Sequence, residues 1–190
     1  MEPGKIYHIY NRGVNKQPIF FDNENYIYFL KQFDKYVSAK VDVLAYCLMP
    51  NHFHLLVRIR MTDGMPIDEI SASTLKSFRD FLISYAKAIN KKYKKTGALF
   101  QQKYKRKEVD NDFYLSGLIQ YIHMNPVKAG LCDNFLNWRF SSYGAIVSGK
   151  PTKVCVSEVL DWFGGLARFI QTHLEKVLDE NHVRKFLFDE

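Results

Sequence analysis

The sequence predicts an α+β domain built on a ferredoxin-like antiparallel sheet, with helices on one face and a C-terminal helical extension. Three segments have the two-residue periodicity of strands, namely residues 6–11, 41–49 and 52–60. Helical periodicity follows the first strand, the hairpin and a short basic strand within residues 100–109. The resulting order, β-α-β-β-α-β-α, is typical of a ferredoxin-like sheet. A chain of 190 residues with 47% hydrophobic residues is long enough to bury one compact core.

The N-terminal elements have clear boundaries in the sequence. Arg12-Gly13 ends the first strand, and a helix is expected from residue 21 or 22 to about residue 38. One face of this helix has the i, i+3, i+4, i+7 spacing of buried residues: Tyr26, Phe29, Leu30 and Phe33. Pro50-Asn51 has the chemistry of a tight turn, because Pro fixes φ and Asn tolerates the second turn position. The flanking strands are therefore expected to form a hairpin.

The C-terminal elements begin after a polar loop at residues 61–68. A long helix is expected from about Ser73 to Lys95, where Thr96-Gly97 stops it. Asp110 or Asn111 can cap the next helix, which should end or kink at Asn125-Pro126 because the residue before Pro avoids the α region. Residues 146–190 contain two more helical stretches. We therefore expect a main domain at 1–145 and an accessory segment at 146–190.

Charge and cysteine content narrow the class of protein. The chain has a formal net charge of +7 and a pI of about 9.2. Residues 1–155 carry a net +10 and residues 156–190 a net −3, so the anion-binding surface is expected in the first part. No apolar run approaches the ~20 residues that span a bilayer. The three cysteines form no CxxC pair, which argues against a disulfide framework and indicates a reducing cytoplasm.

Residues 87–107 form a basic segment that contains nine Lys and Arg residues and no acid. Tyr93, Phe100 and Tyr104 are interleaved with the charges. Positive charge tracks a phosphate backbone and aromatic rings stack on unpaired bases, so the segment favours nucleic-acid binding. The alternative is an ordinary solvated helix face.

Two histidines share one face of the predicted third strand. His52 and His54 are two residues apart, so their side chains project together, while the opposite face carries an apolar row. This row, which should pack under helices, is Phe53, Leu55, Val57 and Ile59. Neutral imidazoles at this spacing can bind one divalent metal ion. Two surface histidines on a half-exposed sheet are the alternative.

The last predicted helix of the main domain carries Tyr121 and Asn125 beside its buried stripe. The two residues are four apart, which places them on one helical face. A tyrosine hydroxyl next to an amide oxygen suits a nucleophile and a metal ligand. The alternative is a half-buried Tyr followed by an Asn that terminates the helix. His123 should point elsewhere, either into the structure or toward DNA.

Two long motifs, in this order along the chain, resemble the HUH single-tyrosine transposases. Residues 46–56 (YCLMPNHFHLL) are similar to the His-hydrophobic-His motif, and residues 121–131 (YIHMNPVKAGL) are similar to the nucleophile segment of the REP-associated branch. Residues 7–13, 99–101 and 138–143 also fit this branch. The resemblance covers roughly residues 4–145.

The resemblance implies a metal-dependent enzyme that cleaves and rejoins single-stranded DNA through a 5′-phosphotyrosine. Tyr121 would be the nucleophile, and His52 and His54 would bind Mg²⁺ or Mn²⁺. Asn125 stands where insertion-sequence relatives carry a Gln ligand. The implied partner is single-stranded DNA that contains a hairpin, in the nucleoid of a bacterial cytoplasm. Insertion-sequence relatives form dimers and REP-associated relatives act as monomers, so a homodimer and a monomer are both open.

Six basic residues are the expected DNA contacts: Arg12, Arg58, Arg60, Lys103, Lys105 and Arg106. Arg58 and Arg60 are favoured because they share the strand face of the two histidines. The C-terminal segment at residues 146–190, which ends in acidic residues, is expected either to pack over the sheet or to compete with DNA for the basic groove.

Other readings of the residues remain. A catalytically silent nucleic-acid-binding module with the same fold predicts that Tyr121→Phe changes no activity. A metal-dependent hydrolase that activates water predicts no covalent protein–DNA species, but the sequence lacks a third carboxylate or histidine near the first two. A role at a membrane surface is the weakest alternative, because the basic segment has no broad apolar stripe.

Overall fold

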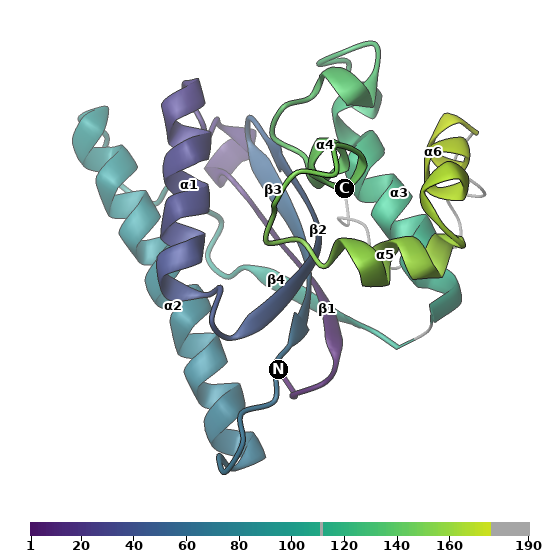
Figure 1. The fold of residues 1–190 in the computed structure, drawn as a ribbon. Helices are drawn as coiled ribbons and strands as arrows, with labels where there is room; N and C mark the ends of the chain where they lie inside the picture. Colours follow the sequence, from purple (N-terminus) through teal and green to yellow (C-terminus); the bar gives the residue numbers. More distant parts are fainter. Residues whose placement is uncertain (111, 176–190) are drawn as a thin grey trace.

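A computed structural model describes residues 1–110 and 112–175 and confirms the predicted α+β class (Figure 1). Its centre is an antiparallel sheet with the strand order β2-β3-β1-β4. This is the strand order of a ferredoxin-like sheet. The strands are β1 (Ile6–Arg12), β2 (Val41–Met49), β3 (His52–Ile59) and β4 (Lys105–Val109).

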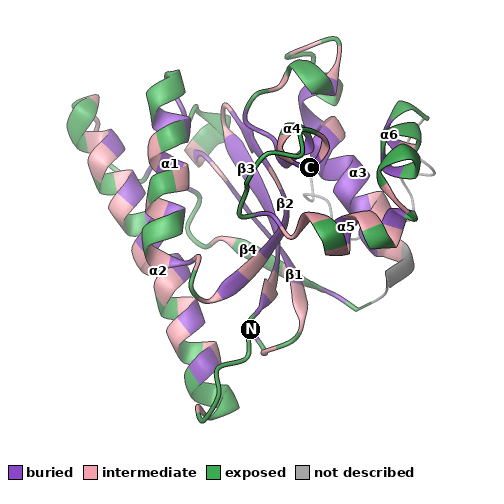
Figure 2. Cartoon of the chain, in the orientation of Figure 1, coloured by how far each residue is buried: buried purple, intermediate pink, exposed green. Residues whose placement is uncertain are grey.

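Helices α1 (Asn23–Tyr36) and α2 (Ile67–Lys92) cover one face of the sheet, as predicted (Figure 1). The apolar side of β3 packs against them: the ring of Phe53 lies 5.1 Å from that of Phe29, measured between centroids. Figure 2 shows buried residues concentrated in the strands and on the inner sides of the helices. The core therefore lies between the sheet and this helical layer.

Helix α2 begins six residues before the predicted start at Ser73. Pro66 lies at the N-cap position, and Asp68 and Glu69 occupy the first turn, where carboxylates stabilise the positive end of the helix dipole. Ile70 is buried, so the first turn also contributes to the core. The polar composition of residues 61–68 concealed this helix start.

The opposite face of the sheet is also covered, so the alternative of two surface histidines on a half-exposed sheet is wrong. Helix α3 (Asp112–Lys128) packs on this face, together with α4 (Ser142–Val147), α5 (Val156–Phe163) and α6 (Leu166–Leu174) (Figure 1). Two short 3₁₀ segments, η1 (Val14–Lys16) and η2 (Phe135–Asn137), complete the structure. The two histidines of β3 therefore lie in an interior layer between the sheet and α3.

Helix α3 continues past Asn125-Pro126 to Lys128, so an end of the helix at this position is wrong, and the alternative of a kink stays a prediction. Proline removes one N–H donor, but the surrounding backbone bonds form. The N–H of Ala129 donates to the Asn125 carbonyl at 2.9 Å, and the N–H of Leu131 donates to the Pro126 carbonyl at 2.9 Å. The capping role predicted for Asn111 lies outside the described residues.

The C-terminal segment packs onto the sheet edge and onto α3. The N–H of Cys155 donates to the Val43 carbonyl at 2.8 Å, which attaches the chain before α5 to β2. The predicted boundary at residue 145 falls within α4, where Tyr143 stacks on Phe169 of α6 at 5.4 Å between ring centroids. Residues 176–190, the last part of the acidic C-terminal segment, lie outside the described residues. Across residues 1–110 and 112–175, no helix is long and apolar enough to cross a membrane.

Candidate functional site

The start of β3 places His52 and His54 side by side on the face that α3 covers. Their ring centroids are 5.1 Å apart and the rings are nearly perpendicular. His54 is fully buried and His52 is 7% exposed. The alternation of strand side chains explains this pairing, and the packing of α3 explains the burial.

Helix α3 brings Tyr121 and Asn125 to the same place. The Tyr121 ring lies 6.0 Å from the His54 ring, edge to face. The Asn125 side-chain Nδ2 donates to the Tyr121 carbonyl oxygen at 2.9 Å, and the Asn125 side chain also hydrogen-bonds His52. The four residues proposed from the sequence as nucleophile and metal ligands therefore form one cluster.

The loop after β1 clamps the turn that precedes His52. The N–H groups of Gly13 and Ile19 donate to the carbonyls of Asn51 and Pro50, each at 2.8 Å. Gly13 permits this path, because a Cβ there would lie 2.1 Å from the carbonyl oxygen of Gln17. The backbone of two loops thus fixes the position of the first histidine.

Each histidine has a side-chain partner that the sequence did not indicate. His54 Nδ1 lies 2.9 Å from Nε2 of His8 on β1, and His52 Nδ1 lies 2.6 Å from Oδ1 of Asn51. His8 is fully buried. Strand periodicity alone places His8 on the same face of β1 as Tyr10. The proximity of His8 to His54, 46 residues later in the sequence, depends on the register between β1 and β3.

Burial keeps both histidines neutral at pH 7. Desolvation lowers the pKa of His52 to about 4, and the nearby Arg12 charge acts in the same direction. Burial also lowers the pKa of His54 well below its usual value of 6.5, with His8, His52 and Arg12 adding to the effect. A neutral imidazole has the lone pair that a metal ligand requires.

The donor set fits a divalent ion that accepts nitrogen and oxygen ligands. Two imidazoles and one amide oxygen, from His52, His54 and Asn125, offer nitrogen and oxygen donors to one divalent ion without surrounding it completely. Within residues 1–110 and 112–175, no three His, Cys, Asp or Glu side chains are arranged to hold a metal. The set that fits thus takes its third donor from an amide.

Positive charge lies next to the cluster. The Lys128 ammonium is 5.0 Å from the centre of the Tyr121 ring; Lys128 is seven residues, or two turns, further along α3. Arg12 is opposite His52 in the strand register, and Lys105 is opposite Tyr10. Lys105 therefore shares the histidine face, whereas Arg106 is opposite Ile9 and shares the face of α2. Lys103 is exposed in the loop before β4.

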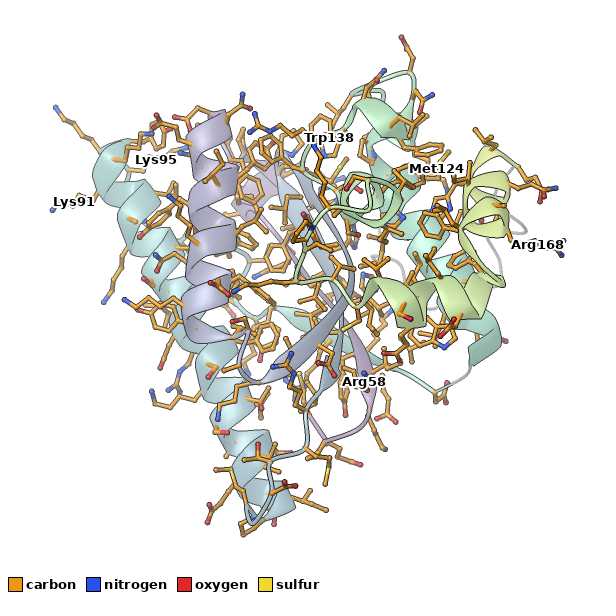
Figure 3. The ribbon with its side chains drawn as sticks, viewed as in Figure 1. Arg58, Lys91, Lys95, Met124, Trp138 and Arg168 are labelled. Carbon is orange, nitrogen blue, oxygen red and sulfur yellow. The ribbon has the colours of Figure 1, made fainter. Side chains whose placement is uncertain are left out.

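Arg58 and Arg60 are engaged in ion pairs at the far end of β3. Arg58 bonds Asp42 at 2.9 Å and also Glu158 of α5, and Arg60 bonds Asp42 at 2.6 Å. These pairs attach the C-terminal segment to the sheet. The predicted DNA contacts of the two arginines stay predictions, and Arg58 has a structural role in addition (labelled in Figure 3).

The basic run at residues 87–107 is divided between two faces of the molecule. Its first part lies on the last turns of α2 and just beyond them, where Lys91 projects outward on the side away from α3 (Figure 3). Lys92 pairs with Asp22 at 2.9 Å, and Lys95 lies over the Phe21 ring. Only the later part, through β4, adjoins the histidine cluster.

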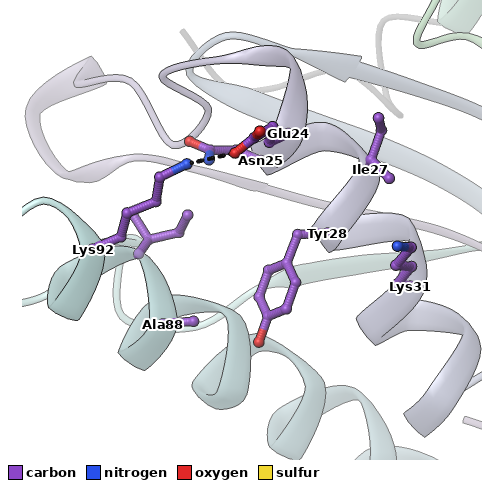
Figure 4. Close-up of a pocket in the computed structure, with 8 residues that line it drawn as sticks. Glu24, Asn25, Ile27, Tyr28, Lys31, Ala88 and Lys92 are labelled. Carbon is purple, nitrogen blue, oxygen red and sulfur yellow. Dashed lines mark hydrogen bonds and ion pairs between the residues drawn. The ribbon is translucent and has the colours of Figure 1, made fainter.

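A groove between α1 and α2 lies on the other side of the sheet (Figure 4). Its volume is about 590 Å³, and Tyr28, Lys31, Ala88 and Lys92 are among its lining residues. None of the residues proposed from the sequence as ligands or nucleophile lines it. The chemistry of the cluster therefore does not take place in this groove.

A second pair of histidines, His123 and His173, joins α3 to α6. His123 Nδ1 lies 2.9 Å from His173 Nε2 of α6, and His123 Nε2 lies 2.7 Å from Ser142 Oγ. His173 Nδ1 must donate to the Phe169 carbonyl at 2.8 Å, and Ser142 Oγ accepts the N–H of Tyr46 at 2.9 Å.

The Phe169 carbonyl fixes the direction of this chain of hydrogen bonds. It accepts the proton on His173 Nδ1, and burial disfavours a second proton on either ring, so His173 Nε2 accepts from His123 Nδ1 and His123 Nε2 accepts from the Ser142 hydroxyl. Each imidazole then carries one proton, in keeping with burial, which lowers the pKa of both rings. His123 is therefore structural, one of the two roles left open by the sequence.

Known proteins resemble this chain in both sequence and fold. The chain matches the family model of IS200-like transposases over residues 4–125. It is 29% identical over 105 residues to a REP-associated tyrosine transposase of Haemophilus influenzae. That alignment covers 54% of this chain and 58% of the relative, so the chain spans little more than half of the relative's length.

Among solved structures, a REP-associated tyrosine transposase bound to a REP hairpin has a similar fold. The TM-score is 0.55 at 15% sequence identity, and the match covers 94% of this chain and 95% of the other. At this identity the likeness concerns the fold alone.

Proposed function

Because the chain belongs to the family of IS200-like transposases, we propose that it cleaves and rejoins single-stranded DNA by a metal-dependent, single-tyrosine reaction. The observation that carries the proposal is the convergence of His52, His54 and Asn125 with Tyr121 in one buried cluster. The histidines lie on β3, and Asn125 and Tyr121 lie on α3, so the cluster joins two distant parts of the chain. Such a combination of lone-pair donors with a hydroxyl serves phosphoryl transfer.

Tyr121 is the proposed nucleophile. Its Oη attacks the phosphorus of a phosphodiester, an O–P bond to the tyrosine forms, and the bond from phosphorus to the 3′-oxygen breaks. The phenolic proton leaves to solvent, and the departing 3′-oxygen takes up a proton to become a hydroxyl. In the reverse direction a 3′-hydroxyl attacks the phosphotyrosine. One phosphoester bond replaces another in each direction, so rejoining needs no ATP.

His52, His54 and the Oδ1 atom of Asn125 are the proposed ligands of Mg²⁺ or Mn²⁺. When bound, the ion polarises the non-bridging oxygens of the phosphodiester. The protein holds these donors rigidly, because β3 fixes the two imidazoles and Asn125 is bonded to the backbone of α3. Lys128 adds a positive charge 5.0 Å from the Tyr121 ring, where negative charge develops during attack.

The proposed substrate is single-stranded DNA that contains a hairpin. Support comes from the net charge of +7 and from the hairpin-bound structure of similar fold. Arg12 and Lys105 lie nearest the cluster along the strand register, and Lys103, Arg106, Arg58 and Arg60 complete the proposed contacts. One copy of the chain supplies the histidines and the tyrosine, and a homodimer stays a prediction. Nucleoid association likewise stays a prediction.

The experiment uses labelled hairpin-containing single strands taken from DNA beside the gene, incubated with the protein and Mn²⁺ or Mg²⁺. Denaturing gels should show cleaved DNA that depends on the metal. Tyr121→Phe and the double variant His52→Ala/His54→Ala should lose cleavage, whereas Tyr114→Phe, a tyrosine on the same helix, should retain it. DNA binding without cleavage in the wild-type protein under both metals would instead favour a silent binding module. Cleavage that survives Tyr121→Phe would favour a water-activating hydrolase.

A further inference from the structure

We propose that His8 and Asn51 are positioning residues that hold His54 and His52 in the tautomer with the proton on Nδ1. The inference rests on the proposed function, because it concerns the two histidines proposed as metal ligands. In this tautomer the lone pair of each imidazole is on Nε2. The two partners come from different segments: His8 from β1, and Asn51 from the turn before β3.

The bonding of Asn51 determines the tautomer of His52. The Asn51 Nδ2 donates to the Lys16 carbonyl at 3.1 Å, which identifies the amide nitrogen and leaves Oδ1 toward the histidine. The distance from this Oδ1 to His52 Nδ1 is 2.6 Å. An amide oxygen only accepts hydrogen bonds, so the proton of the neutral ring is on Nδ1. The lone pair of the neutral ring is then on Nε2, and the Asn125 side chain, which also bonds His52, has a second amide N–H besides the one donated to Tyr121 that can serve this nitrogen.

The pair of His8 and His54 admits two arrangements, of which one suits a metal ligand. The nitrogens are 2.9 Å apart and the rings are within 16° of parallel, so one ring donates in-plane to the other. If His8 donated, a neutral His54 would carry its own proton on Nε2 and present no lone pair there. If His54 donates from Nδ1, His8 Nε2 accepts and His54 Nε2 has the lone pair. We assign the second arrangement.

Both partners are built into the scaffold. His8 is fully buried in the central strand β1, two residues from Tyr10, whose ring is 4.8 Å from that of His8. Asn51 is fixed through its backbone as well, because its carbonyl accepts the N–H of Gly13 at 2.8 Å. The orientation of both imidazoles is therefore set before any ion arrives. Outer partners of this kind typically contribute about 10–100-fold in metal affinity.

The tautomers can be read directly in the metal-free wild-type protein. Long-range ¹H–¹⁵N correlation spectra of histidine-labelled protein at neutral pH distinguish a proton on Nδ1 from one on Nε2. Assignment uses the signals that disappear in His52→Gln and His54→Gln. We expect the Nδ1–H form for both rings. A His54 ring with its proton on Nε2 would overturn the assignment.

Metal affinity tests the consequence, with Mn²⁺ alone as the probe. In an electron paramagnetic resonance titration, the dissociation constant for Mn²⁺ should be at least tenfold larger for His8→Leu and for Asn51→Ala than for the wild-type protein. His8→Gln, which can place an accepting oxygen near the former Nε2, and Asn51→Asp, which keeps an accepting oxygen, should recover most of the affinity. The control is Ile9→Val, on the same strand but on its opposite face. Thermal unfolding of each variant separates affinity changes from loss of fold.

The outcomes distinguish this inference from the proposed function. If the wild-type protein binds Mn²⁺ and His8→Leu and Asn51→Ala bind it equally well, the inference fails and the proposed metal site stands. If the folded wild-type protein binds no Mn²⁺, both fail. If the variants lose affinity and the acceptor-containing variants recover it, the positioning role is established.

Discussion

Replacement of Ser142 by alanine should destabilise the protein far more than the loss of one hydroxyl suggests. Ser142 is fully buried: its Oγ accepts the Tyr46 N–H at 2.9 Å, and its one hydroxyl proton is donated to His123 Nε2 at 2.7 Å. It joins the start of α4 to β2 and to the back of α3. The substitution interrupts the proton-ordered chain that ends at His173 of α6.

The magnitude follows from the partners that lose their bonds. The Tyr46 N–H and His123 Nε2 would each be left buried without a partner, and an unsatisfied buried group costs roughly 1–3 kcal/mol. The expected loss in the free energy of unfolding is therefore about 3 kcal/mol. The neighbouring Ser141 offers a matched control. It caps α4 by accepting the Tyr143 N–H at 3.2 Å, and loss of a cap typically costs about 1 kcal/mol.

Urea unfolding followed by circular dichroism measures both variants against the wild-type protein. We expect Ser142→Ala to lower the free energy of unfolding by about 2 kcal/mol more than Ser141→Ala does. The reasoning would be refuted if Ser142→Ala cost no more than Ser141→Ala. It would also be refuted if His173→Leu, made in the Ser142→Ala background, cost as much as it does alone, because coupled residues are not additive.

Three further predictions address the loop, the buried histidines and the lysine on α3. Gly13→Ala should lower the free energy of unfolding and weaken Mn²⁺ binding, because its Cβ would meet the Gln17 carbonyl oxygen at 2.1 Å; an unchanged melting temperature would contradict this. His52 and His173 both have a pKa lowered to about 4 by burial. Their contribution to stability is complete above pH 6.5 and is lost as the pH falls toward 4, by about 2 kcal/mol for each at pH 5; urea titrations at pH 7.5 and 5 check the slope. Lys128→Met should slow single-turnover cleavage by about tenfold, whereas Lys128→Arg should retain most of the rate; equal rates for both variants would exclude the charge from catalysis.

The fold was predictable because the residue patterns that indicate its strands and helices lie within short segments of the sequence. Alternating residues identify β1 and the β2–β3 hairpin, and their order along the chain restricts the sheet to few topologies. Two helix boundaries differ from the prediction, the start of α2 and the end of α3, and both depend on more than local periodicity. The start of α2 is set by Pro66 and two acidic residues in an otherwise polar loop, and α3 passes through Pro126 because the neighbouring backbone bonds remain intact.

The sequence indicated four residues that lie together in the structure, but not what surrounds them. Two motifs identified His52, His54, Tyr121 and Asn125, and the structure gathers all four. Which helix covers which face of the sheet is not encoded in the period of any single strand, so the burial of the histidines was missed. The partner His8 depends on the register between β1 and β3.

Arg58, one of the predicted DNA contacts, forms ion pairs with residues distant in the sequence. Strand alternation correctly placed Arg58 on the histidine face, but its two carboxylate partners come from β2 and α5. Glu158 is 100 residues away in the sequence. No local pattern indicates such a pair, and only the assembled fold reveals that Arg58 also joins the C-terminal segment to the sheet.

The central claim is that Tyr121 forms a covalent bond with DNA. The most direct measurement is mass spectrometry of peptides from the protein after reaction with hairpin DNA and Mn²⁺, followed by nuclease digestion. We predict a nucleotide adduct on the peptide that contains Tyr121, absent without metal and absent from Tyr121→Phe. Cleaved DNA with no adduct on this peptide, or an adduct on another tyrosine, would contradict the account.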